Sequence, residues 1–177
     1  MKRCIEMFFV AALQLILWYQ YMEPALKSMV RAQSDHELGW IEVINRNLRL
    51  AVPNTIFWVA GFYGFFHLWL NILGELLYYG DRNFYKDWWN CRSIEEYWKT
   101  WNLPVHFWFI RHVYNPLLQR GFSKMSANLI VFFISAVAHE YVVSVPLGLI
   151  TYFAFLAMLL QAPAIFIQRK IDKILRL

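Results

Sequence analysis

The stretch Ser126–Leu147 reads SANLIVFFISAVAHEYVVSVPL, and it decides how the rest of the chain is interpreted. An apolar run, Leu129–Ala138, is interrupted by His139 and Glu140 before apolar residues resume. An ionisable side chain at membrane depth costs about 3 kcal/mol on insertion scales, so it usually faces a cavity and marks a functional path. The alternative is a histidine bonded to a neighbouring helix, and this stretch alone leaves both interpretations open.

The composition indicates a membrane protein that crosses the bilayer several times. Hydrophobic residues make up 59% of the chain and charged residues only 16%, which is more apolar and less charged than soluble globular proteins are. The length of 177 residues suits one domain, covering 1–177. We therefore expect an all-α fold, a polytopic transmembrane helical bundle with an interfacial amphipathic helical loop.

Four apolar segments approach or exceed the roughly 20 residues that a helix needs to cross a bilayer. We expect spans at about 5–22, 52–79, 126–145 and 150–167, with residues 23–49 forming a polar connector. The second segment is long enough to tilt or kink. It carries one polar stripe at helical spacing, which indicates burial against other helices, or alternatively a transport path. The stripe is formed by His67, Asn71 and Glu75.

The positive charge of the chain is explained by membrane topology. The formal net charge is +5, but the lysines and arginines are scattered between apolar runs and form no block on one helix face, which excludes a nucleic-acid partner. With four spans, the loop 81–125 shares a side with both tails, and that side holds most of the basic residues. The positive-inside rule predicts that this side is cytosolic.

The loop 81–125 contains a predicted interfacial helix followed by a break. Ser93 and Glu96 have the spacing of a capping box, which starts a helix. Apolar residues then recur on one face, as in helices that lie in the membrane interface. These residues are Ile94, Tyr97, Trp98 and Trp101. Pro104 disfavours helical geometry at the preceding residue, so we expect the carboxamide of Asn102 to leave the backbone ladder and point into a cavity.

Several other catalytic classes are disfavoured by spacing. The second histidine of a zinc-binding His-Glu-x-x-His motif is missing, because Val143 stands in its place after His139. Cys4 and Cys91 have no thiolate-site spacing, so we expect no metal and no cofactor. Ser135 precedes His139 by one turn but lies in no Gly-x-Ser-x-Gly elbow, which disfavours a hydrolase.

The remaining features suit transfer of a group between a lipid and a charged, water-soluble donor. A neutral imidazole can take a proton from a hydroxyl in a pocket of low dielectric constant. A carboxamide close by can stabilise the charge that develops on a carbonyl oxygen. His139 and Asn102 supply these two groups.

Three motifs carry a resemblance to a known family. They are Phe84-Tyr85-Lys86-Asp87-Trp88-Trp89-Asn90, Trp101-Asn102-Leu103-Pro104-Val105-His106 and Ala138-His139-Glu140-Tyr141. Together they resemble the membrane-bound O-acyltransferase (MBOAT) superfamily, and within it the branch that esterifies diacylglycerol or sterols from acyl-CoA. Two further stretches are closer to the diacylglycerol enzymes: Ile110-Arg111-His112 and Leu50-Ala51-Val52-Pro53-Asn54.

The resemblance implies a role for each matching residue. His139 corresponds to the catalytic histidine, which takes the proton of the diacylglycerol hydroxyl as that oxygen attacks the thioester. Asn102 corresponds to a second catalytic residue that holds the reaction centre. Ser135, Glu140 and Gln161 correspond to polar positions that line the reaction chamber. The acyl-CoA-binding positions are Phe84, Tyr85, Lys86, Asp87, Trp88, Trp89 and Asn90.

The resemblance also implies a setting: a multi-pass protein of the endoplasmic reticulum membrane, with acyl-CoA as co-substrate and triacylglycerol as product. Family members resemble larger bundles, so we expect the chain to correspond to the carboxy-terminal part of one, with a partial MBOAT fold. A full-length form is expected to be able to form homo-oligomers. Two alternatives remain open: sterol esterification, and a truncated, non-catalytic membrane fragment.

Overall fold

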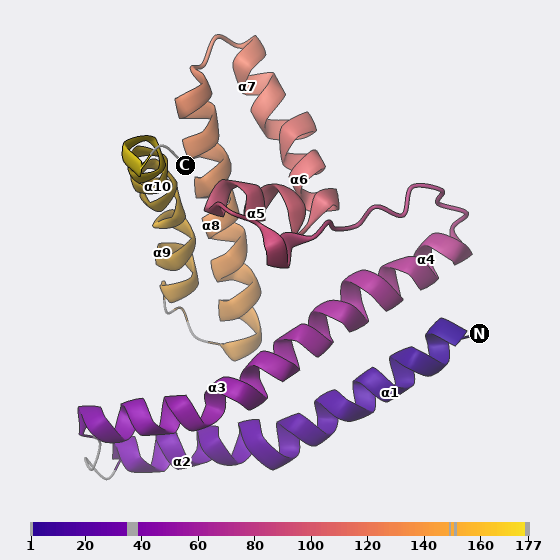
Figure 1. The fold of residues 1–177 in the computed structure, drawn as a ribbon, viewed down its shortest axis with the longest axis vertical. Helices are drawn as coiled ribbons and strands as arrows, with labels where there is room; N and C mark the ends of the chain where they lie inside the picture. Colours follow the sequence, from indigo (N-terminus) through magenta and orange to yellow (C-terminus); the bar gives the residue numbers. More distant parts are fainter. Residues whose placement is uncertain (1, 35–38, 149, 151, 176–177) are drawn as a thin grey trace. The chain divides into compact units, whose positions relative to one another are not determined.

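A computed structural model of the chain describes residues 2–34, 39–148, 150 and 152–175. The described residues form helices and connecting loops without a strand, so the predicted all-α class is confirmed (Figure 1). Thr151, which belongs to the expected fourth span, lies outside the described residues. The chain divides into two compact units, Met1–Arg82 and Asn83–Leu177.

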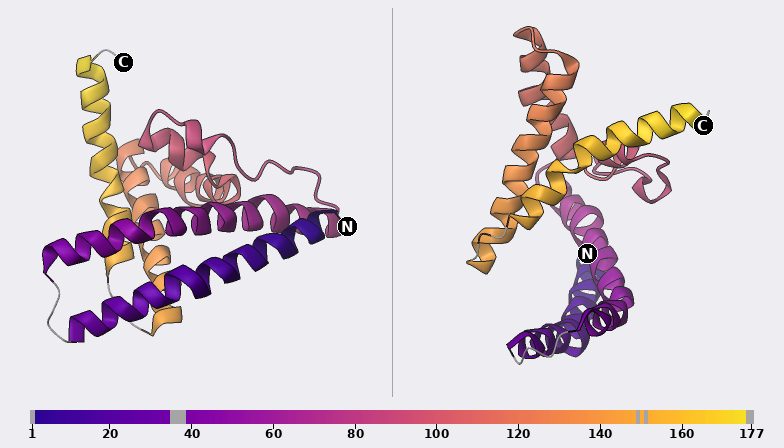
Figure 2. Two further views of the ribbon diagram at one scale, coloured as in Figure 1. Left: turned by 60° about the horizontal axis from the view of Figure 1, so that its bottom comes forward. Right: turned by 90° about the vertical axis from the view of Figure 1, so that its left-hand side faces the viewer.

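The first unit is a pair of long helical segments that lie side by side (Figure 2). The first segment consists of α1 (Lys2–Leu17), the π-helical turn η1 (Trp18–Met22) and α2 (Glu23–Ser34). The second consists of α3 (Trp40–Phe62), the π-helical η2 (Tyr63–Trp69) and α4 (Leu70–Leu76). Within them, Lys2–Ser28 and Trp40–Leu76 are long and apolar enough to cross a membrane.

Most described residues of the predicted polar connector at 23–49 are helical and belong to α2 and α3. Lys27 pairs with Glu23 at 2.6 Å and Arg46 with Glu42 at 2.9 Å, each four residues after its carboxylate. This orientation of acid and base supports a helix. Arg46 also donates to the carbonyl oxygen of Ser28 at 2.9 Å, which ties α3 to α2. The polar residues at 23–34 and 39–49 therefore belong to exposed ends of the two helical segments.

The polar stripe of the second segment is bonded within its own unit. The Nδ2 atom of the buried Asn71 donates to the carbonyl oxygen of His67 at 2.6 Å. The His67 ring stacks on Tyr63 with centroids 4.9 Å apart. Glu75 pairs with Arg82 at 2.8 Å. These local partners explain why polar side chains are found along an apolar helix.

Two glycines allow α1 and the second segment to approach closely. A β-carbon at Gly61 would lie 2.9 Å from Nε2 of Gln14, and one at Gly64 would lie 3.2 Å from Cγ1 of Val10. Both glycines line a groove of about 410 Å³ beside Gln14 and Val10. Small residues permit such close packing of helices in membranes.

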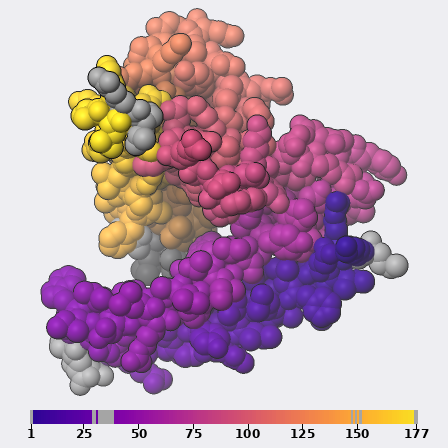
Figure 3. Space-filling view, viewed as in Figure 1, coloured from indigo at the N-terminus to yellow at the C-terminus, as the bar shows by residue number. Residues whose placement is uncertain are grey.

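The second unit begins with the loop that the sequence placed at the membrane interface. It contains the short 3₁₀ turn η3 (Trp88–Asn90), α5 (Ile94–Thr100), α6 (Leu103–Phe109), the π-helical η4 (Ile110–Tyr114) and α7 (Asn115–Gln119). Three helices follow: α8 (Lys124–Leu147), α9 (Phe153–Leu159) and α10 (Gln161–Leu175). α8 packs against α9, and α10 contacts α5 (Figures 1 and 3).

The second unit supplies two more helices that could cross a membrane, Lys124–Pro146 and Phe153–Leu175. The described residues thus contain four such helices, the number expected from the sequence. The last one starts later than expected and continues through the basic residues after position 167 as α10. α8 runs through Pro146 and ends at Gly148, whose φ of 62° suits a residue without a β-carbon.

Candidate active site

His139 lies within α8, where a bond to the previous turn fixes its tautomer. Its Nδ1 atom is 2.7 Å from the carbonyl oxygen of Ser135 and 3.4 Å from the hydroxyl oxygen of the same residue. A carbonyl oxygen can only accept, so Nδ1 carries the proton. The lone pair of the neutral ring is then on Nε2, which is the nitrogen able to take a proton from a substrate.

The face of α8 that carries His139 is uncovered in the second unit. His139 is exposed, as is Val142 one turn later, whereas Ser135 and Ala136 are buried. The described residues of this unit therefore hold the ring in one tautomer without enclosing it.

Glu140 connects α8 to the start of α9. Its Oε1 atom accepts from the hydroxyl of Ser144 at 2.6 Å and from the backbone N–H of Tyr152 at 2.8 Å. Its Oε2 atom accepts from the backbone N–H of Phe155 at 3.1 Å. A carboxylate at this position satisfies N–H groups that the first turn of a helix leaves unpaired. The carboxylate expected in the reaction chamber is thus engaged in closing the α8–α9 hairpin.

Asn102 is the N-cap of α6. Its Oδ1 atom accepts from the backbone N–H of Val105 at 3.2 Å. The sequence predicted that Pro104 would free this carboxamide from backbone hydrogen bonding. In the structure its oxygen atom accepts the capping bond. Because an N–H can only donate, the oxygen is the capping atom and Nδ2 points away from it as a donor.

The segment Phe84–Asn90 runs alongside the junction of α5 and α6. The backbone N–H of Leu103 donates to the carbonyl oxygen of Phe84 at 3.0 Å. The backbone N–H of Lys86 donates to the carbonyl oxygen of Thr100 at 2.8 Å. Phe84 is buried. Two backbone bonds therefore bracket Asn102, and the predicted acyl-CoA segment is attached to the predicted catalytic carboxamide.

Aromatic rings fill the space between this segment and α5. Trp88 contacts Trp89 with centroids 5.8 Å apart and Tyr97 with centroids 6.1 Å apart, both edge to face. Tyr97 stacks on Trp101. Burial raises the pKa of Tyr97 above its ordinary value. The capping residue predicted for α5 is confirmed, since the Ser93 hydroxyl accepts from the backbone N–H of Glu96 at 3.0 Å.

The structure brings the predicted site residues together in two groups. Ser135 and His139 form one on α8; Asn102 and the Phe84–Asn90 segment form the other. Among the described residues, the first group is joined by the contacts of His139 Nδ1 with Ser135, and the second by the backbone bonds of Phe84 and Lys86. Gln161 starts α10 and donates to the carbonyl oxygen of Ala157 at 3.4 Å. Within the same part of the chain, no group of three or more acidic, histidine or cysteine side chains is placed to hold a metal ion.

Two residues of this unit were missed by sequence reasoning. Gln168 and Arg169 follow the last predicted span, 150–167, yet both bond to the start of α5. Their contacts span more than seventy positions of the chain. No local pattern of spacing signals a contact of this kind.

Comparison with known proteins gives one family. Residues 1–171 match the model of the MBOAT, membrane-bound O-acyltransferase family. The chain is similar to diacylglycerol O-acyltransferase 1-2 of Oryza sativa subsp. japonica, with 48% identity over 152 residues, 85% of this chain and 31% of the relative. It is also similar to diacylglycerol O-acyltransferase 1 of Homo sapiens, with 45% identity over 163 residues, 92% of this chain and 33% of the relative. The chain spans about a third of the length of these curated relatives.

Proposed function

This chain belongs to the membrane-bound O-acyltransferase family, and on that premise we propose that it serves acyl transfer from acyl-CoA to the free hydroxyl of diacylglycerol. The relatives are named for this acceptor. The structural observation that carries the proposal is the bond between His139 Nδ1 and the carbonyl oxygen of Ser135, because it leaves Nε2 as a base.

The proposed reaction needs one proton carrier. Nε2 of His139 takes the hydroxyl proton as the alcohol oxygen attacks the thioester carbon and forms the new C–O bond. Negative charge then develops on the carbonyl oxygen, where Nδ2 of Asn102 is the proposed donor. When the C–S bond breaks, the imidazolium returns the proton to the sulfur of CoA. The products are triacylglycerol and free CoA, so no cofactor is consumed.

The two groups of residues fit the two substrates. Diacylglycerol is a lipid, and His139 lies about 22 Å along the helix axis from Lys124, within an apolar span. CoA is charged and water-soluble, and the Phe84–Asn90 segment belongs to the loop between spans. α5 bonds to Gln168 in the middle of α10, which supports placing this loop on the side of the membrane where the carboxy-terminal half of α10 lies. We propose that this side is the cytosolic face of the endoplasmic reticulum.

The test is transfer of radiolabelled oleate from oleoyl-CoA in membranes that carry the protein. Replacing His139→Ala should lower transfer by about 10²–10⁴-fold, the usual contribution of a general base. His112→Ala is the matched control, because His112 is an exposed histidine of η4 in the same unit. Unchanged transfer in the His139 variant would refute the general-base role. Supplying diacylglycerol and cholesterol side by side tests the acceptor, and faster esterification of cholesterol would support sterol acylation instead.

The exposed face around His139 favours a second candidate, a membrane protein that does not catalyse transfer alone. Enzyme active sites commonly exclude water from the reacting groups, and the described residues do not enclose the His139 ring. Purified chain that transfers acyl groups by itself excludes this candidate. Transfer seen only when the chain is co-expressed with a full-length relative supports it.

A further inference from the structure

The middle of α10 is bonded to the beginning of α5 through both ends of one carboxamide. Oε1 of Gln168 accepts from the backbone N–H of Ile94 at 2.9 Å. Nε2 of Gln168 donates to the carbonyl oxygen of Arg92 at 3.3 Å. The backbone N–H of Ile94 belongs to the first helical turn of α5, which has no partner within the helix. Gln168 therefore adds a bond from α10 to the start of α5, beside the Ser93 cap.

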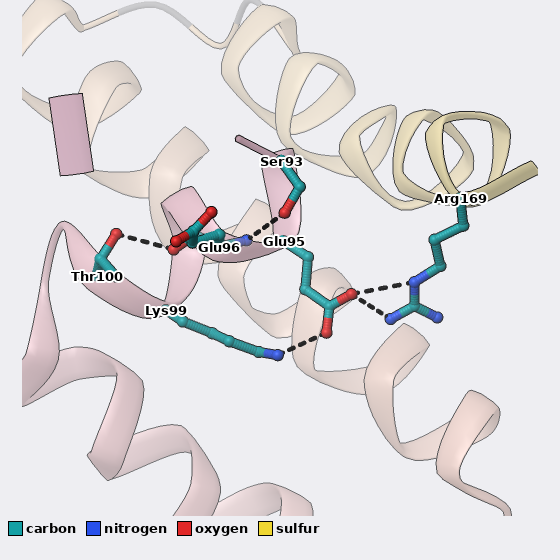
Figure 4. A network of polar contacts seen from close by, with 6 residues as sticks. All are labelled: Ser93, Glu95, Glu96, Lys99, Thr100 and Arg169. Carbon is teal, nitrogen blue, oxygen red and sulfur yellow. Dashed lines mark hydrogen bonds and ion pairs between the residues drawn. The ribbon is translucent and has the colours of Figure 1, made fainter. Parts of the chain in front are cut away.

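A second contact beside it joins three charged side chains (Figure 4). Nε of Arg169 donates to Oε2 of Glu95 at 3.0 Å, and Nζ of Lys99 donates to Oε1 of the same carboxylate at 2.6 Å. Glu95 thus accepts from its own helix on one side and from α10 on the other. Hydrogen bonds from Lys99 and Arg169 hold the pKa of Glu95 below its ordinary value of 4.5. The carboxylate is accordingly ionised at neutral pH and attracts both cations.

The other end of α5 is bonded to the predicted acyl-donor segment. Its last residue, Thr100, accepts from the backbone N–H of Lys86, and Leu103 donates to Phe84 just beyond. α5 is a helix of seven residues, too short to be stable by itself in water. Contacts at both ends must therefore hold it, and those at its beginning come from the Ser93 cap and from α10.

We propose that Gln168 and Arg169 are positioning residues, which use the middle of α10 as a strap that holds α5 and so keeps the Phe84–Asn90 segment ready for the acyl donor. Ordering a binding segment in advance lowers the entropy lost on binding. The strap itself is a property of the fold. Only its role toward acyl-CoA rests on the proposed function.

The two cysteines of the chain give a direct test. Cys91 lies between the donor segment and α5 and is partly buried, whereas Cys4 is exposed in α1 and serves as the internal reference. In detergent, Arg169→Glu combined with Gln168→Ala should raise the rate of maleimide labelling at Cys91 by about fivefold, the population shift expected from losing a strong exposed ion pair. Cys4 should be labelled at the rate of the unaltered protein. Lys170→Ala, next to the strap and outside it, should leave both rates unchanged.

Reversing the charges of Glu95, Lys99 and Arg169 together distinguishes loss of the strap contact from general unfolding. The variant E95K/K99E/R169E keeps Gln168 and has attraction at each charged contact, so its Cys91 rate should be closer to that of the unaltered protein than the rate of Arg169→Glu alone. An unchanged Cys91 rate in the Arg169→Glu, Gln168→Ala variant overturns the strap. Equal acceleration at Cys91 and Cys4 overturns it as well, because the variant is then unfolded rather than locally released.

Protection of Cys91 from maleimide labelling by oleoyl-CoA tests whether the strap affects binding of the acyl donor. Oleoyl-CoA should slow the labelling of Cys91 in the unaltered protein. The strap variant should need an oleoyl-CoA concentration about fivefold higher for the same protection. Oleate, the same chain without the nucleotide, controls for detergent-like effects. If oleoyl-CoA protects neither protein while the variant is still labelled faster, the proposed function fails and the strap stands. If protection requires the same concentration in both proteins, the positioning role is overturned.

Discussion

The backbone N–H of Leu103 donates to the carbonyl oxygen of Phe84 at 3.0 Å, so the residue after Asn102 is tied to the first residue of the proposed donor segment. A second backbone bond, from Lys86 to Thr100, lies on the other side of Asn102. The proposed catalytic carboxamide and the proposed donor segment are therefore parts of one element. A substitution that tests the chemistry of Asn102 must leave this element intact.

Asn102→Asp separates the capping role of Asn102 from its proposed catalytic role. Aspartate is as good an N-cap as asparagine, so the bond to the backbone N–H of Val105 should be kept. The variant has no amide N–H to offer a developing oxyanion and places a negative charge beside it. We expect kcat for acyl transfer to fall by at least about 10²-fold, as when one oxyanion donor is removed.

Thermal unfolding in detergent provides the control for this comparison. Asn102→Asp should unfold like the unaltered protein, while Asn102→Ala should lose about 1 kcal/mol with its cap. Should the aspartate variant keep full activity, Nδ2 has no part in catalysis and Asn102 is a cap alone.

Glu140→Gln should weaken the α8–α9 hairpin. The carboxylate accepts from the backbone N–H groups of Tyr152 and Phe155 through different oxygens, and glutamine keeps only one accepting oxygen. One N–H then loses its partner, and because neither donor is fully buried we expect a loss of about 0.5–1.5 kcal/mol, the net value of one hydrogen bond. The measurement is the thermal midpoint in detergent. An unaltered midpoint would show that the hairpin does not depend on this cap.

Tyr152→Gly, at the same junction, is expected to act in the opposite direction. Tyr152 has φ 59°, in the left-handed region that glycine adopts without a steric cost. If Glu140 holds a strained residue in place, the glycine variant should be about as stable as the unaltered protein or more so, by up to about 1 kcal/mol. A lower thermal midpoint would show that contacts of the tyrosine ring outweigh the strain.

Features within one helix could be predicted from the sequence, and contacts between distant segments could not. The all-α class, the four apolar helices and the Ser93 cap follow from hydropathy and from residues three or four positions apart. The helices α2 and α3 extend into residues 23–49, which were predicted as a polar connector, and the acid–base pairs of that stretch at i, i+4 favour a helix.

The candidate site shows the same division. Ser135 precedes His139 by one turn, so their proximity follows from spacing alone. The cap made by Glu140 reaches Tyr152 and Phe155 across a turn, and the strap from Gln168 reaches Ile94 across most of the second unit. Such contacts depend on how the helices pack, which the sequence pattern of each helix does not specify.

Gly61 and Gly64 should respond differently to alanine. A β-carbon at Gly61 would meet the end of the flexible Gln14 side chain, which can move away. One at Gly64 would meet Cγ1 of Val10, whose β-branched side chain has few alternative rotamers in a helix. Alanine gains up to about 1 kcal/mol of helix propensity at either position. We expect Gly61→Ala to raise the thermal midpoint or leave it unchanged and Gly64→Ala to lower it; the reverse order would contradict this account of the packing.

The half-buried His106 should make the stability of the protein depend on pH near neutrality. Burial lowers the pKa of His106 below its ordinary value of 6.5, and Lys99 adds to the shift. The fold therefore prefers the neutral ring, and between the two pKa values the unfolded chain binds more protons than the folded one. The free energy of unfolding should be highest above pH 6.5 and should fall as the pH drops through that value toward the lower pKa of the folded protein. His106→Gln should reduce the difference in thermal midpoint between about pH 8 and about pH 5.5, while His112→Gln serves as the exposed control. An equal pH dependence in the His106 variant and the unaltered protein would show that this ring is not the group responsible.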